Sequence, residues 1–325
     1  MTIRWGIIGC GDVVWKRVAR AIQDDPNSEL VALCRRDPQK LAAFCNEFGV
    51  NRSSTEANDL ISASDIDALY IATPVHLHHP QTIAAAQAGK HVLVEKPMAL
   101  STAECDEMID VCREADVRLG VAYYRPFYPV IQRMSQLIDD GAIGSVLSVS
   151  AITSTPFAID PGEDGYWRVI PGEGGGGSLM DVGSHRLELF LRMFGPIRDV
   201  KALCGTIAVD YQSENVASLI LQFESGIHGT LQCFFGTDTE QDEFAVLGTK
   251  GRLTSRPLNG GSLVIERNTE RQTEMHPPAG NLNSPLIADF AAAIVAQRQP
   301  TVTGERGRAV NRVMELAYQN AGAPH

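Results

Sequence analysis

Two side chains in the second half of the chain have the types and spacing of a proton-transfer site. Asp181 and His185 are four residues apart in an apolar segment with helical periodicity, so both would lie on one face of a helix. A carboxylate beside an imidazole can orient its tautomer and raise its basicity, as general acid–base catalysis requires. The spacing alone fits an ordinary helix-surface pair equally well. The glycine run at 174–177, just before this segment, indicates close approach of another group.

A lysine is the third candidate for proton transfer. Lys96 lies in the sequence Glu95-Lys96-Pro97, directly after an apolar segment with strand character, and proline restricts the residue before it to extended backbone. An ammonium group that is partly removed from water beside a cationic ring gives up its proton more readily, which suits it to act on a substrate hydroxyl. A Lys-Pro pair in an isolated loop would carry no such meaning.

A glycine-rich turn follows the first expected strand. Residues 9–14 read Gly-Cys-Gly-Asp-Val-Val and continue into a helical pattern. The two glycines allow a tight turn and close approach to a pyrophosphate, whose charge the helix N-terminus would meet. Val14 occupies the third position of the fingerprint, where Gly or Ala is usual, so a purely structural turn stays open. Its place after the first strand of a βαβ series favours a dinucleotide.

The end of the second expected strand is basic. An NAD-preferring site would place an acidic residue about 20 positions beyond the glycine-rich turn, where it binds the ribose 2′-hydroxyl. Arg35 stands there instead, followed by Arg36 and, one helical turn later, by Lys40. Guanidinium groups suit the oxygens of a 2′-phosphate, so NADP is favoured. Asp37 leaves NAD possible, and a solvated basic loop is the alternative interpretation.

Composition and charge limit the class of protein. The 325 residues are 44% hydrophobic with a formal net charge of -11, which excludes disordered, collagen-like and disulfide-scaffold classes and argues against nucleic-acid or anionic-membrane partners. The seven cysteines are odd in number, scattered and without a Cys-x-x-Cys pair, so we expect neither a disulfide framework nor a thiolate zinc site. No stretch approaches the ~18 apolar residues of a membrane span. We therefore expect a cytoplasmic protein with a small-molecule partner.

The elements that must position these groups change character near residue 122. Before it, short apolar runs alternate with helical patterns, which predicts a doubly wound parallel sheet whose ligands bind at the carboxyl ends of the strands. Strands are expected at 3–8, 30–34, 68–72, 91–94 and 118–121, and helices at 13–23, 39–48, 81–88 and 102–115.

Beyond residue 122 the pattern is that of an α+β domain with an antiparallel sheet. Strands with period-two alternation follow one another from 197 to 266 with no helix between them. Further elements are helices at 129–139, 179–194, 285–297 and 305–320, a β-rich run at 145–155 and a glycine- and proline-rich loop at 156–177. We expect domains 1–122 and 123–325, leave open whether the last helix packs back on the first, and expect the sheet face at 200–235 to be covered in a homodimer or homotetramer.

Over nearly its whole length the chain resembles the glucose-fructose oxidoreductase, inositol dehydrogenase and rhizopine catabolism (Gfo/Idh/MocA) family. The very specific part is the segment 89–97, Gly-Lys-His-Val-Leu-Val-Glu-Lys-Pro, and the pattern Asp-x-Gly-x-His at 181–185 is moderately specific. The other matching features are the glycine-rich turn, Ala72-Thr73-Pro74 with His78, Tyr166-Trp167-Arg168 and the glycine run.

The resemblance implies a Rossmann domain, a substrate domain with an open, mostly antiparallel sheet, and hydride transfer between nicotinamide C4 and a carbon of a sugar, polyol or related vicinal diol. By position, His185 would exchange a proton with the reacting oxygen, Lys96 would hydrogen-bond or relay, and Asp181 would orient. The same three residues would contact the substrate. Arg125, which stands where the family often has an asparagine-containing segment, would touch the substrate or close the cleft. The expected cofactor contacts are Gly9, Gly11, Asp12, Val13, Arg35, Arg36, Lys40, Thr73, Pro74, His76, Leu77, Glu95, Lys96, Trp167 and Arg168.

Three alternatives stand beside this interpretation. His76, His78 and His79 invite a metal site, but no carboxylate or thiolate stands at ligand spacing, so no metal is expected. A non-net-redox enzyme, such as one that cleaves a glycoside through a keto sugar with a retained cofactor, stays open. A non-catalytic NADP-binding sensor would have no need of the intact lysine, aspartate and histidine.

Overall fold

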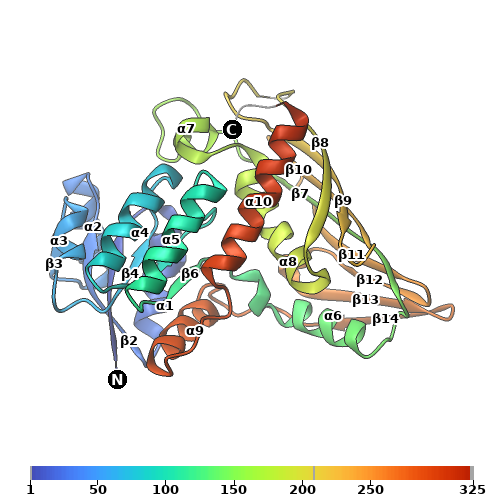
Figure 1. Cartoon of the computed structure of the whole chain (residues 1–325), viewed down its shortest axis with the longest axis horizontal. Helices are drawn as coiled ribbons and strands as arrows, with labels where there is room; N and C mark the ends of the chain where they lie inside the picture. Colours follow the sequence, from blue (N-terminus) through green and yellow to red (C-terminus); the bar gives the residue numbers. More distant parts are fainter. Residues whose placement is uncertain (1, 208, 323–325) are drawn as a thin grey trace. The chain divides into compact units, whose positions relative to one another are not determined.

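The computed structural model describes residues 2–207 and 209–322, which fall into two compact units (Figure 1). The first unit comprises the residues up to Tyr124 together with Gly280–Arg308, and the second comprises Arg125–Ala279 with the residues from Ala309 onward. That 1–122 and 123–325 act as separate functional domains stays a prediction.

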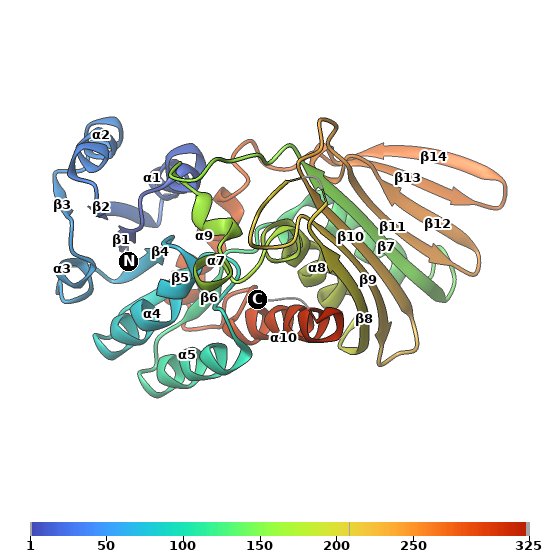
Figure 2. The same ribbon diagram turned by 90° about the horizontal axis from the view of Figure 1, so that it is seen from above.

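The first unit is built on a six-stranded parallel sheet. Its strand order is β3-β2-β1-β4-β5-β6, so the direction of winding reverses between β1 and β4, as in dinucleotide-binding sheets. Figure 2 shows helices on both faces of this sheet. The strands are β1 (Ile3–Ile8), β2 (Ser28–Cys34), β3 (Arg52–Ser54), β4 (Ala68–Ile71), β5 (His91–Val94) and β6 (Leu119–Val121).

In the first unit, helix α1 packs against α9 and helix α4 packs against α5. The fully buried indole of Trp5 in β1 lies 5.6 Å from the ring of Phe290 in α9 and donates a hydrogen bond to Ser28 Oγ at 3.0 Å. The helices are η1 (Val14–Val18), α1 (Ala19–Asp24), α2 (Pro38–Phe48), α3 (Ala57–Ile61), η2 (Val75–Leu77), α4 (His78–Gln87), α5 (Thr102–Glu114) and α9 (Ser284–Val295).

Two expectations for the first unit need correction. The helix expected at 81–88 begins earlier, at His78, because Pro80 lies in its first turn, where proline is tolerated. The short elements β3 and α3 were not predicted, since Arg52-Ser53-Ser54 is a polar edge strand without an apolar run.

The second unit is built on an eight-stranded sheet in the order β14-β13-β12-β11-β7-β10-β9-β8. All its neighbouring strands are antiparallel except β7 and β10, which run parallel. The predicted fold class is therefore confirmed. The strands are β7 (Val146–Thr155), β8 (Ile197–Gly205), β9 (Val216–Phe223), β10 (His228–Phe235), β11 (Asp242–Gly248), β12 (Gly251–Ser255), β13 (Ser262–Arg267) and β14 (Glu270–Met275).

Helix α8 covers one face of this sheet. Its Phe190 lies 5.5 Å from Phe244 of β11, and Phe194 lies 5.8 Å from Phe223 of β9, measured between ring centroids. The helical segments are η3 (Arg125–Phe127), α6 (Pro129–Asp139), η4 (Tyr166–Val169), α7 (Pro171–Gly174), η5 (Leu179–Gly183), α8 (Ser184–Phe194), η6 (Leu258–Gly260) and the long α10 (Gly304–Ala321), which the division between the units crosses.

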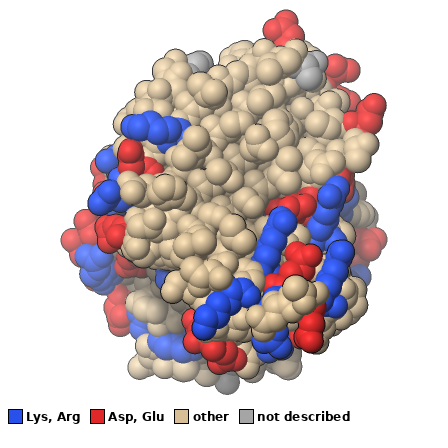
Figure 3. All heavy atoms as spheres, turned by 90° about the vertical axis from the view of Figure 1, so that its right-hand side faces the viewer, with Lys and Arg blue, Asp and Glu red and all other residues tan. Residues whose placement is uncertain are grey.

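The opposite face of the sheet carries exposed apolar side chains. Leu203 of β8 is 78% exposed, Ile220 of β9 63% and Leu247 of β11 45%. Figure 3 shows a broad area without charged side chains on the side of the molecule that carries this sheet, with charged side chains gathered beside it.

No helix within residues 2–207 and 209–322 combines the length and the apolar character needed to cross a membrane.

Candidate active site

The glycine-rich turn lies at the carboxyl end of β1, beside the loop that follows β4. Gly9 has a φ of +93°, and a Cβ atom there would lie 2.6 Å from both Ala72 O and Thr73 N. Only glycine therefore fits at this position. At Gly11 a Cβ atom would meet nothing nearer than Gly9 O at 3.9 Å. The turn is thus tight on the protein side at Gly9 and open at Gly11, which fits close approach by a pyrophosphate.

The helix that follows the turn begins at Asp12 and includes the π turn η1. Among the described residues, no side chain caps the first turn of η1. Asp12 forms an exposed ion pair with Lys16 at 2.9 Å, one helical turn along. The positive end of the helix is therefore suited to the phosphate groups of a nucleotide.

Arg35, the first basic residue after β2, is held beside the turn. Arg35 donates a hydrogen bond to Cys10 O, and its guanidinium lies 6.0 Å from the ring centroid of Phe44. Asp37 caps α2 by accepting hydrogen bonds from the amides of Gln39 and Lys40 at 2.9 and 3.0 Å. Those amides, that of Lys40 first, lower the pKa of the Asp37 carboxyl. Asp37 is thus engaged in the fold as a helix cap.

His78 joins the loops that follow β4 and β5. Its Nε2 lies 2.9 Å from Thr73 O and its Nδ1 lies 3.0 Å from Pro97 O. The ring is fully buried, and this burial lowers the pKa of His78 to about 4. The neutral imidazole carries one N–H and donates to only one of these carbonyl oxygens, while its buried ring packs between the Thr73 loop and the loop that carries Lys96. In the sequence His78 belongs to the family pattern and to a histidine cluster with no expected metal, and its place between these two loops could not be predicted.

Lys96 follows β5 at the carboxyl edge of the sheet and is half-buried. Its neighbour Glu95 is fixed by two hydrogen bonds, because Tyr70 Oη donates to Glu95 Oε1 at 2.6 Å and the Lys96 amide donates to Oε2 at 3.2 Å. Burial, with the nearby Glu95 charge, raises the pKa of Tyr70 well above its ordinary value, so the phenol keeps its proton. Tyr70 was missed in the sequence, although a tyrosine in a short, wholly buried strand needs a polar partner.

Asp181 and His185 lie on one helix in the second unit, but its first turn is not α-helical. Residues Leu179–Gly183 form a π turn in which Ser184 N donates to Leu179 O. The expected α-helix at 179–194 is thus corrected at its start, and an α-helical spacing of four does not describe this turn. Single π turns inside helices are frequent at functional sites. His185 is 5% exposed, and Asp181 is half-buried.

Other parts of the same chain pack closely against the glycine run that precedes this helix. A Cβ atom on Gly177 would overlap Glu214 O, and one on Gly176 would overlap Tyr318 Oη. The Glu214 carboxylate accepts hydrogen bonds from the amides of Gly177 and Leu179, both at 2.8 Å. Neither Glu214 nor Tyr318 was identified in the sequence.

The remaining predicted residues of the second unit lie in short 3-10 turns. Trp167 and Arg168 belong to η4, and the Arg168 guanidinium lies 4.7 Å from the Trp167 ring centroid, a cation–π contact. Arg125 lies in η3 and is 8% exposed. The structure thus gathers the predicted cofactor residues up to Lys96 in the first unit, while Arg125, Trp167, Arg168, Asp181 and His185 belong to the second.

Comparison with known proteins decides the family. Residues 3–123 match the family model "Oxidoreductase family, NAD-binding Rossmann fold", and residues 131–254 match the "GFO/IDH/MocA C-terminal domain". A curated relative, 1,5-anhydro-D-fructose reductase of Ensifer adhaerens, is 30% identical over 94% of this chain and 92% of its own. The chain belongs to the Gfo/Idh/MocA oxidoreductase family. The resemblance stated from the sequence is thereby confirmed.

Further similarities cover this Gfo/Idh/MocA protein from end to end. D-xylose 1-dehydrogenase (NADP(+)) 2 of Haloferax volcanii is 29% identical over 98% of this chain and 97% of its own. Among solved structures, aldose-aldose oxidoreductase from Caulobacter crescentus, complexed with glycerol, matches with a TM-score of 0.90 at 28% identity and covers 99% of this chain and 98% of that chain. The first unit of this family member is accordingly an NAD-binding Rossmann domain.

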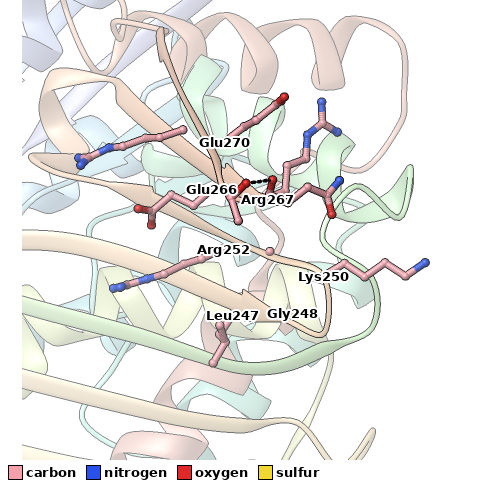
Figure 4. Close-up of a pocket in the computed structure, with 11 residues that line it drawn as sticks. Leu247, Gly248, Lys250, Arg252, Glu266, Arg267 and Glu270 are labelled. Atoms are coloured by element: carbon pink, nitrogen blue, oxygen red, sulfur yellow. Dashed lines mark hydrogen bonds between the residues drawn. The ribbon is translucent and has the colours of Figure 1, made fainter.

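Other features of this oxidoreductase lie apart from the predicted site residues. A groove of about 410 Å³ is lined by the ends of the strands β11–β14, with Arg252 and Glu266 among its walls (Figure 4). A second groove lies between α4 and α5, where His79 Nε2 is 2.8 Å from Glu107 Oε2. In the part of the chain that the structure describes, no group of three or more His, Cys, Asp or Glu residues is arranged to hold a metal ion.

Proposed function

We propose that this protein is an NADP-preferring oxidoreductase that transfers a hydride between nicotinamide C4 and a hydroxyl-bearing carbon of a sugar, polyol or related vicinal diol. The observation that carries the proposal is the glycine-rich turn, which lies at the same sheet edge as Lys96. In this turn the protein backbone packs against Gly9, whereas the space beside Gly11 is free for a ligand. The names of its relatives support the substrate class, since they include 1,5-anhydro-D-fructose reductase and D-xylose 1-dehydrogenase.

The residues of the first unit fit a nicotinamide dinucleotide. The turn at Gly9 and Gly11, with Asp12 and Val13 at the start of the helix, would hold the pyrophosphate. Thr73, Pro74, His76, Leu77 and Glu95 would line the nicotinamide half, and Trp167 and Arg168 of the second unit would add contacts. When bound, the cofactor supplies the hydride acceptor or donor.

The preference for NADP rests on the charges after β2. Arg35 is fixed to the glycine-rich turn, Arg36 and Lys40 are exposed, and Asp37 is occupied as the cap of α2. Guanidinium groups so placed suit a 2′-phosphate. Titration of each nucleotide, followed by intrinsic fluorescence, should give tighter binding of NADP than of NAD. Arg35→Ala and Arg36→Ala should reduce the ratio of the two dissociation constants. Arg20→Ala, the same charge change on an exposed residue of α1, should leave this ratio unchanged. Tighter binding of NAD by the unmodified protein would contradict the preference.

We propose that three side chains handle the proton. His185 exchanges a proton with the reacting oxygen, Lys96 hydrogen-bonds to or relays from that oxygen, and Asp181 orients the imidazole. These roles rest on position in the family pattern and on the placement of Asp181 and His185 on one helix. Arg125 contacts the substrate together with these three residues, although the family often has an asparagine-containing segment at its position.

A substrate panel tests the reaction. The protein is mixed with NADP or NAD and with aldoses, inositols or dihydrodiols, and the absorbance of reduced nicotinamide is followed at 340 nm. We expect a rise with at least one member of the panel. Substrate consumption with tightly retained nucleotide and no change in bulk absorbance would identify a non-net-redox enzyme instead. Binding of a sugar with no turnover in either direction would identify a sensor.

We further propose that a second copy of the chain covers the sheet face that carries Leu203, Ile220 and Leu247. The broad uncharged area on this side of the sheet, together with these exposed apolar side chains, fits a self-complementary interface. Light scattering on the unmodified protein should give the mass of a dimer or tetramer, and Ile220→Lys should lower it. A monomeric mass for the unmodified protein would contradict the assembly. None of the seven cysteines, all of which the structure describes, forms a disulfide bond. This fits the reducing cytoplasm, which we propose as the location.

A further inference from the structure

Glu214 accepts hydrogen bonds from three successive backbone amides at the start of the helix that carries Asp181 and His185. Gly177 N donates to Glu214 Oε2 at 2.8 Å, Ser178 N to Glu214 O at 3.1 Å and Leu179 N to Glu214 Oε1 at 2.8 Å. The first amides of a helix have no partner within it and need one from outside. Glu214, from a loop 37 residues along the chain from Gly177, supplies three such partners.

Glu214 is itself held from two further sides. The Tyr318 hydroxyl of α10 donates to Glu214 Oε1 at 3.1 Å. The next residue, Asn215, is bonded to the sheet, because its amide donates to Gly205 O at 3.1 Å and its carbonyl accepts from Phe235 N at 2.9 Å. Glu214 therefore joins the ends of β8 and β10 to the start of the helix.

The connection reaches Asp181 through one peptide unit. The amide of Gly177 donates to Glu214, while the carbonyl oxygen of the same residue accepts a hydrogen bond from Asp181 N at 3.0 Å. A shift of the first helical turn away from Glu214 would thus displace the Asp181 backbone directly. His185 follows on the same continuous helix.

The charge of Glu214 is matched to this position. Its side chain is almost fully buried, at 5% exposed, and burial raises the pKa of the carboxyl, whereas the amide donors of Leu179 and Gly177 and the Tyr318 hydroxyl oppose that rise. A buried carboxylate is tolerated where several donors and the positive end of a helix face it. A glutamine in its place would offer one acceptor oxygen and turn its NH₂ group toward one of the amides.

We propose that Glu214 is a positioning residue for the reaction, one that fixes the first turn of the helix and thereby the orientation of Asp181 and His185. The inference rests on the proposed function, because those two side chains act on the substrate only if that proposal holds. Glu214 does not touch substrate or cofactor in this account. Its effect on turnover passes through the helix.

The test compares Glu214→Gln with Glu274→Gln in the full-length protein. Glu274 is the matched control, since it is a mostly buried carboxylate of the same unit that bonds to Arg133 and His276 and makes no bond to the helix. We expect Glu214→Gln to lower kcat about tenfold or more, because small displacements of catalytic groups are costly. Cofactor affinity, measured by fluorescence, should change less than about twofold. Glu274→Gln should keep wild-type kcat, although both variants lose thermal stability.

A double-variant experiment distinguishes a specific effect on the position of His185 from a general loss of order in the protein. In the His185→Ala background, Glu214→Gln should slow residual turnover much less than it slows the wild type, because the group it positions is gone. An equal factor in both backgrounds would overturn the proposal, as would wild-type kcat in Glu214→Gln. Should Glu214→Gln fail to fold, Tyr318→Phe removes only the hydroxyl bonded to Glu214 and should lower kcat about threefold. Unchanged kcat in Tyr318→Phe would then overturn the inference.

The outcomes also distinguish a failure of this inference from a failure of the proposed function on which it rests. If His185→Ala keeps wild-type turnover, the proposed catalytic roles fail whatever Glu214→Gln does. If His185→Ala lowers turnover to a small residual rate while Glu214→Gln leaves turnover intact, only the role of Glu214 fails.

Discussion

Gly177 has no room for a side chain, because the Glu214 carbonyl oxygen lies where its Cβ atom would be. The glycine run therefore owes part of its composition to a contact inside the protein, one that joins the sheet to the start of the helix. The same glycine donates its amide to the Glu214 carboxylate. The two residues thus meet through both backbone and side chain.

A methyl group at Gly177 should consequently destabilise the protein. We expect Gly177→Ala to lower the free energy of unfolding by about 1–3 kcal/mol, the usual cost of overpacking, and to lower kcat with it. Gly172→Ala is the matched control in the same loop region, where a Cβ atom meets nothing within 4 Å. Urea denaturation measures both variants. Equal stability of Gly177→Ala and Gly172→Ala would contradict the close contact.

The two glycines of the nucleotide turn should separate stability from cofactor binding. Gly9→Ala forces a side chain into a left-handed backbone and against Ala72 and Thr73, so it should destabilise the protein even without nucleotide. Gly11→Ala should leave the nucleotide-free protein about as stable as the wild type, because its Cβ atom meets open space.

Cofactor affinity should nevertheless fall in Gly11→Ala, by about tenfold, since the added methyl group occupies the space meant for the pyrophosphate. Thermal unfolding with and without NADP measures both properties at once. If NADP stabilises Gly11→Ala as strongly as the wild type, the pyrophosphate does not lie at this turn.

The buried imidazole of His78 should make stability depend on pH. Its pKa of about 4 in the folded protein lies below the ordinary value of about 6.5, because burial disfavours the charged ring. The unfolded chain therefore takes up a proton first, so the contribution of His78 is complete above pH 6.5 and is lost as the pH falls toward 4. The loss is on the order of 3 kcal/mol.

His78→Asn removes the titrating group and should flatten this part of the pH profile. Urea denaturation of wild type and variant at pH 7.0, 6.0 and 5.0 gives the difference, in which other titrating groups cancel. A difference in stability that is independent of pH would show that His78 is charged, or exposed, in the folded protein.

Most of the fold could be predicted because its central elements carry their own local pattern. The strands β1, β4 and β5 are apolar runs between helical segments, and they lie in the middle of their sheet. The polar edge strands β3 and β14 escaped prediction, since an edge strand needs no apolar run on both faces. The hairpin before β14 turns at Asn268 and Thr269, both at positive φ, and a β-branched residue gives no sign of that conformation.

Some residues of the candidate site could likewise be predicted from local sequence, and others could not. Lys96, Asp181 and His185 could be identified because each stands in a contiguous motif. Glu214 and Tyr318 could not, since their partners lie 37 and 104 residues away and only the folded chain brings them together. Sequence spacing predicts neighbours on one element, whereas these contacts join different elements.

The turnover of two variants is the sharpest test of the proposed proton transfer by Lys96 and His185. With NADP and a substrate confirmed in the panel, wild type, Lys96→Met and His185→Ala are compared by the initial rate of absorbance change at 340 nm, after fluorescence titration has shown that each binds NADP. We predict that both variants bind the nucleotide nearly as tightly as the wild type and lose all but a small residual turnover, because the proton on the reacting oxygen then lacks its carrier. Wild-type turnover in either variant would contradict the account.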